Sequence, residues 1–400
     1  MALISIAKLL LLLFASCTLL LTQRAPEVRK ILAASWTPIV VLLILATFAV
    51  SLFWTVAPQA DALGSLAKYG KLLVILVMMA LIRDRQEALY ALSAFMLAQV
   101  FLLASSWMLF AKLPVPWATS NMALTQNAVF SSYLDQGIIG AVFAAICWHC
   151  RALAPGRFGR VIAMGLALMA LLNVVFVLMG RSGHVVAIAL VSLAIMWELP
   201  KRYRAIVVLL PFFLALALFF SSSKVRERLT LAKTEVQSFS SEEAAPHTSS
   251  GVRLGFWLSA AQIMEQHPLT GTGVGSWSTE YNRLQHEKNP AHVAIDGNGN
   301  PHQEYLLWGV QLGIPGILLL LALMLSVLRD SLKMEQSCAR ATQSTLAALA
   351  VTCLFNASIY DAQIGDFFCV IIGVLLALGL SENNHQASAT IALTSPESAT

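Results

Sequence analysis

The sequence predicts an all-α protein that crosses a membrane many times. Hydrophobic residues make up 58% of the 400 residues, charged residues only 12%, and the mean hydropathy is +0.73. Soluble proteins carry about a quarter charged residues. A hydrocarbon core of about 30 Å requires roughly 17 to 25 apolar residues per helix. Because backbone in lipid must satisfy its own hydrogen bonds, the long apolar runs of this chain are expected to be spanning helices.

We predict about 11–12 transmembrane helices. The apolar runs place eleven of them, at residues 3–22, 37–56, 66–82, 87–110, 127–149, 160–180, 183–198, 205–220, 303–328, 341–358 and 366–381. The first run contains Lys8 and has neither a charged segment before it nor a small-residue cleavage site, so we interpret it as a retained span. An even number of spans would place the N-terminus in the cytoplasm, against the charges of the first loop.

Positive charges indicate which loops face the cytoplasm, because Lys and Arg are enriched on that side. Alternating short loops carry them, at residues 24–30, 83–85, 151–160, 201–204 and 329–340. The opposite side then holds the turn 180–183, the long segment 221–302 and the connection 356–366. The net charge of +5 follows this topology and does not indicate a nucleic-acid partner.

The hydrophobic map predicts a division into four parts. These are an N-terminal transmembrane bundle at 1–220, a mainly helical loop domain at 221–302, C-terminal transmembrane helices at 303–381 and a disordered cytoplasmic tail at 382–400. Within the loop domain, apolar residues spaced by three or four predict an amphipathic helix near 251–266 that lies on the membrane face. The tail is rich in small polar residues.

Residue spacing argues against several other kinds of site. Cys147–Cys150 with its histidine supplies only part of a structural zinc site, which needs four ligands. The loop domain contains no cysteine, so no disulfide framework is expected there. The glycine-rich turn at 268–277 lacks the preceding strand of a dinucleotide-binding motif. The segment 296–307 begins like a calcium loop but has Pro301 where that loop needs glycine.

Candidate functional residues gather where the loop domain meets the membrane. His302 stands at the point where the polar segment ends and the next apolar run begins. Arg181 lies in a short, glycine-flanked outer turn, against the positive-inside tendency. Arg253 opens the predicted amphipathic helix, with Trp257 one turn further on. A base and cations at this boundary indicate chemistry on a substrate that is part lipid and part water-soluble.

Four short motifs carry a family resemblance. They are Arg253-x-x-x-Trp257, Pro268-Leu-x-Gly-x-Gly-x-Gly-x-Trp277, His302-x-x-Tyr305-Leu306 and Gly313-Ile-Pro-Gly316. Together they resemble the O-antigen ligase and polymerase superfamily of lipid-carrier-dependent glycosyltransferases. The specific motifs occupy about 251–316, and the segments 355–361 and 365–368 further resemble the ligase branch. Gln303 departs from the pattern, because the family usually has Asn or Ser after the histidine.

The resemblance implies a GT-C-like enzyme of the bacterial inner membrane. It implies that an O-antigen ligase transfers a glycan from undecaprenyl diphosphate to a sugar hydroxyl of the lipid A core, at the periplasmic face, in lipopolysaccharide assembly. Diphosphate is a good leaving group, so the reaction needs a base for the acceptor and fixed positive charge for the phosphates. His302 fits the catalytic base, and Arg181 and Arg253 fit a diphosphate clamp.

A metal ion is not expected in this reaction. The sequence contains no Asp-x-Asp, the usual ligand set for a divalent ion bridging a diphosphate. We therefore predict metal-independent transfer without a cofactor, by single displacement with inversion at the anomeric carbon.

Further residues are candidates for supporting roles, namely His184, Asp135, Trp257, Gln303, Tyr305, Asp361 and Asp366. His184 shares a helical face with Arg181 and can bind phosphate or simply pack. Asp135 is costly inside its predicted span, which indicates either a functional role or pairing with an arginine such as Arg181. Asp361 and Asp366 can orient the acceptor or an arginine.

Two other functions stay open. An O-antigen polymerase would use the same donor with a carrier-linked glycan as acceptor, and the mechanistic residues do not separate it from a ligase. A lipid-linked sugar transporter would carry internal repeats and interrupted helices near the midplane. The candidate residues gather at one face instead, which favours an enzyme.

Overall fold

The computed structural model describes residues 13–14, 17–18, 34–221, 249–297 and 299–394. Within these ranges the regular structure is helical and no strand occurs. The predicted all-α class is therefore confirmed. Most of the predicted first span at 3–22 and most of the segment from 221 to 250 lie outside the described residues.

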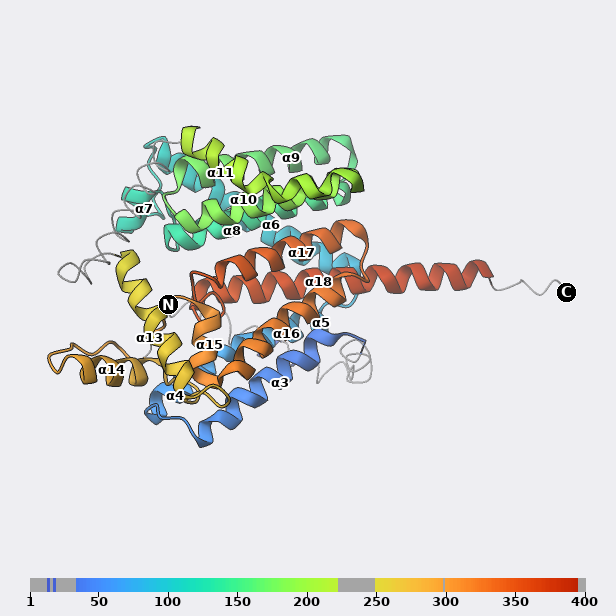
Figure 1. Ribbon diagram of the computed structural model, residues 1–400. Coiled ribbons are helices and arrows are strands. Elements are labelled where there is room, and N and C mark those ends of the chain that lie inside the picture. Colours follow the sequence, from blue (N-terminus) through green and yellow to red (C-terminus); the bar gives the residue numbers. More distant parts are fainter. Residues whose placement is uncertain (1–12, 15–16, 19–33, 222–248, 298, 395–400) are drawn as a thin grey trace.

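The helices follow one another along the chain as shown in Figure 1. The α-helices are α3 (Trp36–Val50), α4 (Gln59–Tyr69), α5 (Leu73–Leu81), α6 (Arg85–Phe110), α7 (Asn121–Gln126), α8 (Tyr133–His149), α9 (Gly156–Leu172), α10 (Arg181–Glu198), α11 (Leu210–Ser221), α13 (Ser249–Gln266), α14 (Trp277–Lys288), α15 (Glu304–Leu312), α16 (Ile314–Ser331), α17 (Gln336–Thr352) and α18 (Ala362–Thr394). Short 3₁₀ or π turns are η1 (Ser51–Phe53), η2 (Gly70–Leu72), η3 (Cys150–Leu153), η4 (Asn173–Val177) and η5 (Lys201–Val208).

Eight helical segments among the described residues are long and apolar enough to cross a membrane. They are Trp36–Phe53, Gln59–Leu81, Arg85–Phe110, Tyr133–Leu153, Gly156–Val177, Arg181–Glu198, Ile314–Ser331 and Ala362–Leu380. This number and the helical content agree with a polytopic membrane protein. α11 and α17, at the predicted spans 205–220 and 341–358, have only 12 and 17 residues.

The predicted continuous span at 303–328 is wrong, because the structure divides it into α15 and α16. The break is at Gly313, whose φ of +70° suits glycine and few other residues. The amide of Ile314 donates to the Pro268 carbonyl at 2.7 Å, and Pro315 lies in the first turn of α16. Hydropathy does not detect such a break, because the residues on both sides of it are apolar.

Two other boundaries also differ from the prediction. α8 begins at Tyr133 rather than at residue 127, because the Ser132 hydroxyl caps the helix by accepting from the Asp135 amide at 3.1 Å. α18 continues to Thr394, so residues 382–394 of the predicted disordered tail are helical. Neither glycine nor proline occurs between residue 380 and residue 395 to end this helix.

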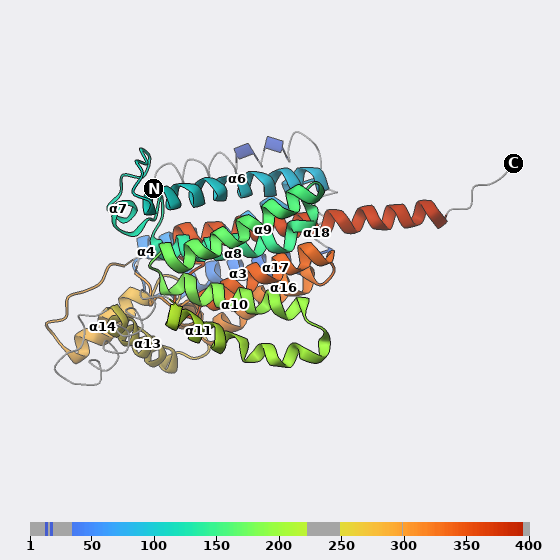
Figure 2. The same cartoon turned by 90° about the horizontal axis from the view of Figure 1, so that it is seen from above.

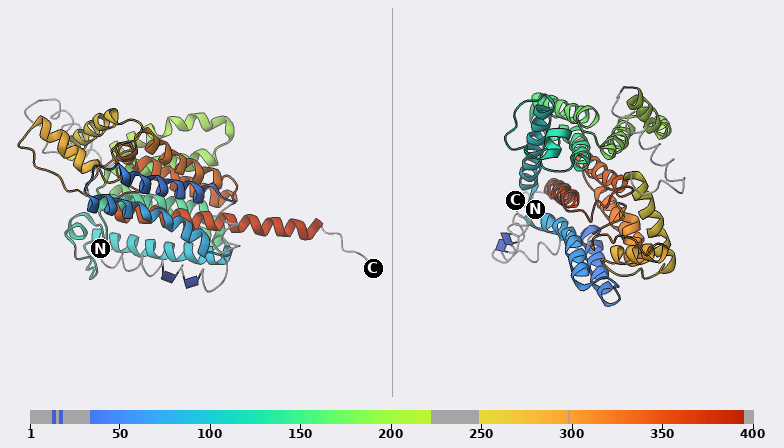
Figure 3. Two further views of the ribbon diagram at one scale, coloured as in Figure 1. Left: turned by 90° about the horizontal axis from the view of Figure 1, so that it is seen from below. Right: turned by 90° about the vertical axis from the view of Figure 1, so that its left-hand side faces the viewer.

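The spanning helices run side by side, and α13 and α14 lie beyond one end of the bundle (Figure 1). α8, α10 and α18 begin at this end, which we call the site end. The turns between α5 and α6, α8 and α9, and α16 and α17 lie at the other end, from which α18 projects (Figures 1 and 2). These turns hold charges predicted to face the cytoplasm. Seen along the helices in Figure 3, α18 lies among the other helices, against α5, α6 and α17.

A glycine-rich turn fastens the loop region to the bundle. The amide of Gly273 donates to the Gln311 carbonyl at 2.9 Å, and Thr55 donates its hydroxyl to the Val274 carbonyl at 2.8 Å. Gly273 has φ +92°, and a Cβ there would lie 2.3 Å from the Thr55 Cα. The glycines therefore allow close backbone contact between this turn, the end of α15 and the segment after α3. This contact accounts for a motif that otherwise resembles a phosphate loop.

Candidate active site

α13 supplies Arg253 and holds it against two other segments. The Arg253 guanidinium donates to the Phe355 carbonyl at 3.4 Å. One turn later the Trp257 indole donates to the Pro301 carbonyl at 3.1 Å. The other side of α13 buries Ala260 and Ile263 and packs on α15. Arg253 is thus fixed between the segment before α15 and the segment before α18.

His302 lies in the turn immediately before α15. Its φ of +54° is left-handed, and its amide donates to the Asn300 side-chain oxygen at 2.8 Å. The imidazole is half-buried and stacks on Phe256, with ring centroids 6.4 Å apart. Within the described part of the chain, neither ring nitrogen has a hydrogen-bond partner. The ring is therefore held by its backbone and by Phe256, and its nitrogens are available to a substrate.

Burial, and then the positive charge of Arg253, lower the pKa of His302 below its ordinary value of 6.5. The imidazole is consequently neutral at neutral pH. A neutral imidazole can accept a proton, as a general base must.

Arg181 begins α10 at the site end, and two glycines set its position. Gly183 of α10 crosses Gly137 of α8 so closely that a Cβ on Gly183 would lie 2.9 Å from the Gly137 backbone. Arg181 and Arg253 are electrostatic neighbours: burial, followed by the charge of Arg181, lowers the pKa of Arg253. Tyr133, at the start of α8, raises the pKa of Arg253 and so favours its charged form. The structure thus brings the two predicted clamp residues together, although they are far apart in sequence.

Asp361 lies beside this pair. Burial, and then the nearby Asp135 carboxylate, raise the pKa of Asp361 to about 6, against the opposing effects of Lys71 and Asn300. The Asn300 side-chain amide donates to Asp361 at 3.0 Å. Because Asn300 also accepts from the His302 backbone, Asp361 is connected to the base through one residue. Asp361 also favours the charged form of Arg253.

Other candidates serve the local structure. The His184 ring contacts the carbonyl of Gly180, just before its helix, at 2.7 Å and that of Val175 in η4 at 3.3 Å. The Gln303 side chain caps α15 by accepting from the Leu306 amide. The Tyr305 hydroxyl donates to the Ala350 carbonyl of α17 at 3.2 Å. Asp366 lies half-buried in the second turn of α18.

Glu304 was not predicted from the sequence, yet it organises the site. This carboxylate is 0% exposed and accepts from the amides of Ile359 and Tyr360, at 2.8 Å and 3.2 Å, and from the Trp308 indole at 2.7 Å. It thereby joins the start of α15, two residues after His302, to the segment that carries Asp361. The sequence contained one signal, since a charged residue at the start of an apolar run is costly unless it has partners.

Lys71 is a second residue that was not predicted from the sequence. It is 7% exposed, and its ammonium donates to the Tyr360 and Asp361 carbonyls at 3.1 Å and 2.7 Å. A lysine inside the predicted span 66–82 was again a signal of function or pairing. Lys71 and Glu304 therefore hold the 359–361 segment from two sides.

The assembled groups are two neighbouring guanidinium groups, a neutral imidazole and a carboxylate, at one end of a helical membrane bundle. This set can bind an anion with two phosphates and can take a proton from a hydroxyl. Within the described residues, no three His, Cys, Asp or Glu side chains gather in a group that could hold a metal ion. The metal-independent mechanism stays a prediction.

Comparison with known families identifies the central part of the chain. A family model described as O-antigen ligase matches residues 164–321, a segment that includes Arg181, Arg253 and His302. Comparison with curated proteins finds no match. The match, together with the polytopic helical fold, supports a glycosyltransferase-like function of the ligase or polymerase type. On this basis residues 164–321 are similar to the O-antigen ligase family, and the match supports an assignment to that family.

Proposed function

We propose that this protein transfers a glycan from undecaprenyl diphosphate to a sugar hydroxyl of the lipid A core. The observation that carries the proposal is the Arg181–Arg253 pair. Arg253 is half-buried, and burial and Arg181 both lower its pKa, which means that both disfavour its charged form. Two like charges held together in this way are stabilised by an anion between them. A diphosphate provides that anion at the boundary where a lipid-linked donor would lie.

His302 completes the proposed mechanism as the base. The acceptor hydroxyl gives its proton to the imidazole while its oxygen bonds to the anomeric carbon. The bond from that carbon to the diphosphate oxygen breaks, and its electron pair leaves on the carrier diphosphate. Arg181 and Arg253 offset the negative charge that develops there. One displacement of this kind inverts the anomeric carbon.

Asp361 and Asn300 are positioning residues in this proposal. Asn300 links the Asp361 carboxylate to the backbone of His302, and Asp361 favours the charged form of Arg253. The clamp and the base are therefore oriented by the same carboxylate. We place this end of the bundle at the periplasmic face of the bacterial inner membrane, which is supported by the positively charged turns at the other end.

A transfer assay with purified protein tests the function. Undecaprenyl diphosphate-linked glycan is supplied with rough lipopolysaccharide, in EDTA, and the products are separated by size. We expect glycan on the lipid A core. Growth of carrier-linked chains without transfer to lipopolysaccharide would identify a polymerase instead, and absence of both products while donor crosses a vesicle membrane would identify a transporter.

Gly183→Ala tests the position of Arg181. The added methyl would lie within 3 Å of the Gly137 backbone, so α10 must move away from α8 beside Arg181. A misplacement of about 1 Å can cost on the order of 10²-fold in rate, and we expect a loss of this size in the transfer assay. Gly165→Ala in α9 is the matched control, because a Cβ there meets nothing within 4 Å. Equal activity of the two variants would contradict a need for close α8–α10 packing.

A further inference from the structure

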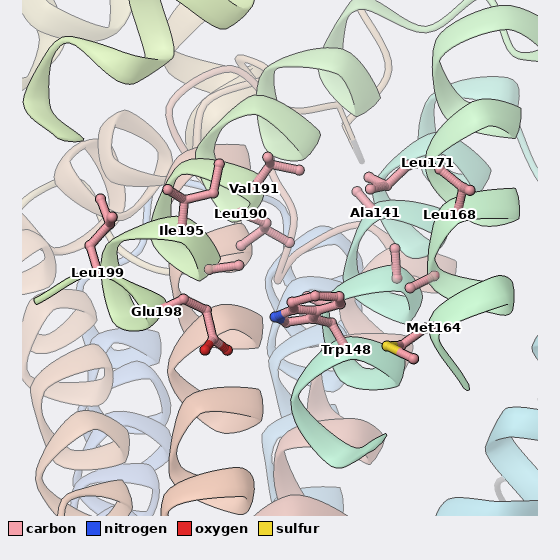
Figure 4. Close-up of a pocket in the computed structure, with 14 residues that line it drawn as sticks. Ala141, Trp148, Met164, Leu168, Leu171, Leu190, Val191, Ile195, Glu198 and Leu199 are labelled. Carbon is pink, nitrogen blue, oxygen red and sulfur yellow. The ribbon is translucent and has the colours of Figure 1, made fainter. Parts of the chain in front are cut away.

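A cavity of about 450 Å³ lies between α8, α9 and α10 (Figure 4). Of the 14 residues that line it, Glu198 is the only charged one and the others are apolar. α8 contributes small alanines, which leave space between the larger residues of α9 and α10. Leu168 of α9 and Ile195 of α10 are 58% and 36% exposed. The cavity therefore opens sideways, toward the lipid that surrounds a spanning bundle.

One end of the cavity is polar. Glu198 of α10 and Trp148 of α8 lie together at this end (Figure 4). Arg151 pairs with Glu198 at 3.0 Å and stacks on the Trp148 ring, 4.3 Å from its centroid. Arg340 of α17 lies 3.8 Å from the same carboxylate. Two cations and one anion thus surround the end of an apolar cavity.

The Trp148 indole N–H lacks a hydrogen-bond acceptor at this end of the cavity among the described residues. Its nitrogen is buried, and in the described part of the chain it has no hydrogen-bond partner. In Figure 4 this nitrogen points toward the α10 side of the cavity. A buried N–H without an acceptor is destabilising. An occupant with an acceptor oxygen at this level would satisfy it.

We propose that this cavity binds one acyl chain of phosphatidylethanolamine. The phosphate lies against Arg151 and Arg340, an ester carbonyl accepts from the Trp148 indole, and the ammonium pairs with Glu198. The phosphate, the ester carbonyl and the ammonium of this lipid then each meet a group of opposite charge or a hydrogen-bond donor at this end of the cavity. Basic pockets between transmembrane helices bind lipid headgroups in the same way.

The direction of the cavity distinguishes this lipid from the glycan donor. α10 runs from Arg181 at the site end to Glu198, a length of about 27 Å for its 18 residues. A carrier whose diphosphate lay at Arg181 would bring the apolar end of its chain toward the charged end of the cavity. A phospholipid from the opposite leaflet places its headgroup there. The inference does not depend on the transfer reaction.

Native mass spectrometry of the purified protein in detergent tests the site, with phosphatidylethanolamine or phosphatidylglycerol titrated in. Arg151→Gln and Arg340→Gln should each weaken phosphatidylethanolamine binding about fivefold, equivalent to about 1 kcal/mol per arginine. Glu198→Gln should weaken phosphatidylethanolamine but not phosphatidylglycerol. Ala194→Phe, which fills the cavity, should remove the bound lipid.

Matched controls separate the site from general surface attraction. Arg157→Gln removes the same charge from an exposed position of α9, and Ala189→Phe adds the same ring on α10 outside the cavity lining. Equal weakening by Arg157→Gln would overturn the site. Tighter phosphatidylglycerol binding in Glu198→Gln, with phosphatidylethanolamine unchanged, would overturn the assigned headgroup. Displacement of the lipid by undecaprenyl phosphate would assign the cavity to the carrier. The arginine variants decide the matter even where Ala194→Phe fails to fold.

Discussion

We expect that replacing His302 with Asn lowers the rate of glycan transfer by about 10²- to 10⁴-fold, which is the usual loss when a general base is removed. Asn is chosen because His302 has φ +54°, a conformation that Asn tolerates better than Ala. The variant retains the backbone bond to Asn300 and the local turn but has no base. The measurement is transfer to rough lipopolysaccharide, alongside the thermal stability of the purified protein.

His267→Asn is the control for this prediction, because it makes the same change at an exposed position after α13. Its transfer should equal that of the wild type. Near-normal transfer by His302→Asn would remove the imidazole from the mechanism. A large loss of thermal stability in that variant would show instead that the turn, and not the base, had been disturbed.

The pH dependence adds a second readout of the same residue. Burial and Arg253 lower the pKa of His302, and the neutral form is the base, so kcat/KM should be constant above pH 6.5 and fall below it. Bound diphosphate offsets the charge of Arg253 and so raises the pKa of His302 in the substrate complex. The fall of kcat at low pH should therefore occur at a higher pH than the fall of kcat/KM. Asp361, with a pKa of about 6, titrates in the same range, and the observed limb belongs to both groups.

Replacing Glu304 with Ala should strongly lower the thermal stability of the protein, because it disrupts the hydrogen bonds at the site end. The change leaves three N–H donors without an acceptor, those of Ile359, Tyr360 and Trp308. Each buried donor left unsatisfied costs on the order of 1–3 kcal/mol. The segment that carries Asp361 is then released, and transfer should fall together with the thermal stability.

Glu304→Gln provides the matched comparison. Burial raises the pKa of Glu304 to about 7, so its carboxyl is partly protonated near neutral pH. A neutral amide should therefore lower the thermal stability less than Ala does. The glutamine oxygen still accepts from Ile359 and Tyr360, whereas its amide faces the Trp308 donor. Glu265→Ala, at an exposed position of α13, should be neutral. Equal stability of the Ala and Gln variants would show that Glu304 acts by its size and not by its hydrogen bonds.

Hydropathy predicted the helices best where apolar runs are long and uninterrupted. The segment 87–110 was predicted almost to its boundaries, since Asp84 caps α6 and nothing interrupts it. The segment 303–328 was not, because one glycine with positive φ divides it while leaving its hydropathy unchanged. A backbone dihedral set by contact with Pro268 is not visible in residue composition.

The candidate site shows the same division. The sequence singled out Arg181, Arg253 and His302, because a charged or titratable residue at the membrane boundary indicates a functional role. The structure gathers the three at one end of the bundle. Glu304 and Lys71 were missed because both have partners in the segment 359–361 before α18, which is far away in the sequence. Lys71 contacts the Asp361 carbonyl, which is 290 positions away, and no pattern within one sequence specifies which helices pack together.

The length of α18 provides a means of determining this protein experimentally. Its 33 residues correspond to about 50 Å of helix, well beyond a hydrocarbon core of about 30 Å. The added turns project from the end of the bundle opposite His302 (Figure 1). A soluble helical protein fused in register with α18 would form one continuous helix with it. Electron cryo-microscopy could align particles on this rigid fiducial, and the fusion would leave the site end unobstructed for donor and acceptor.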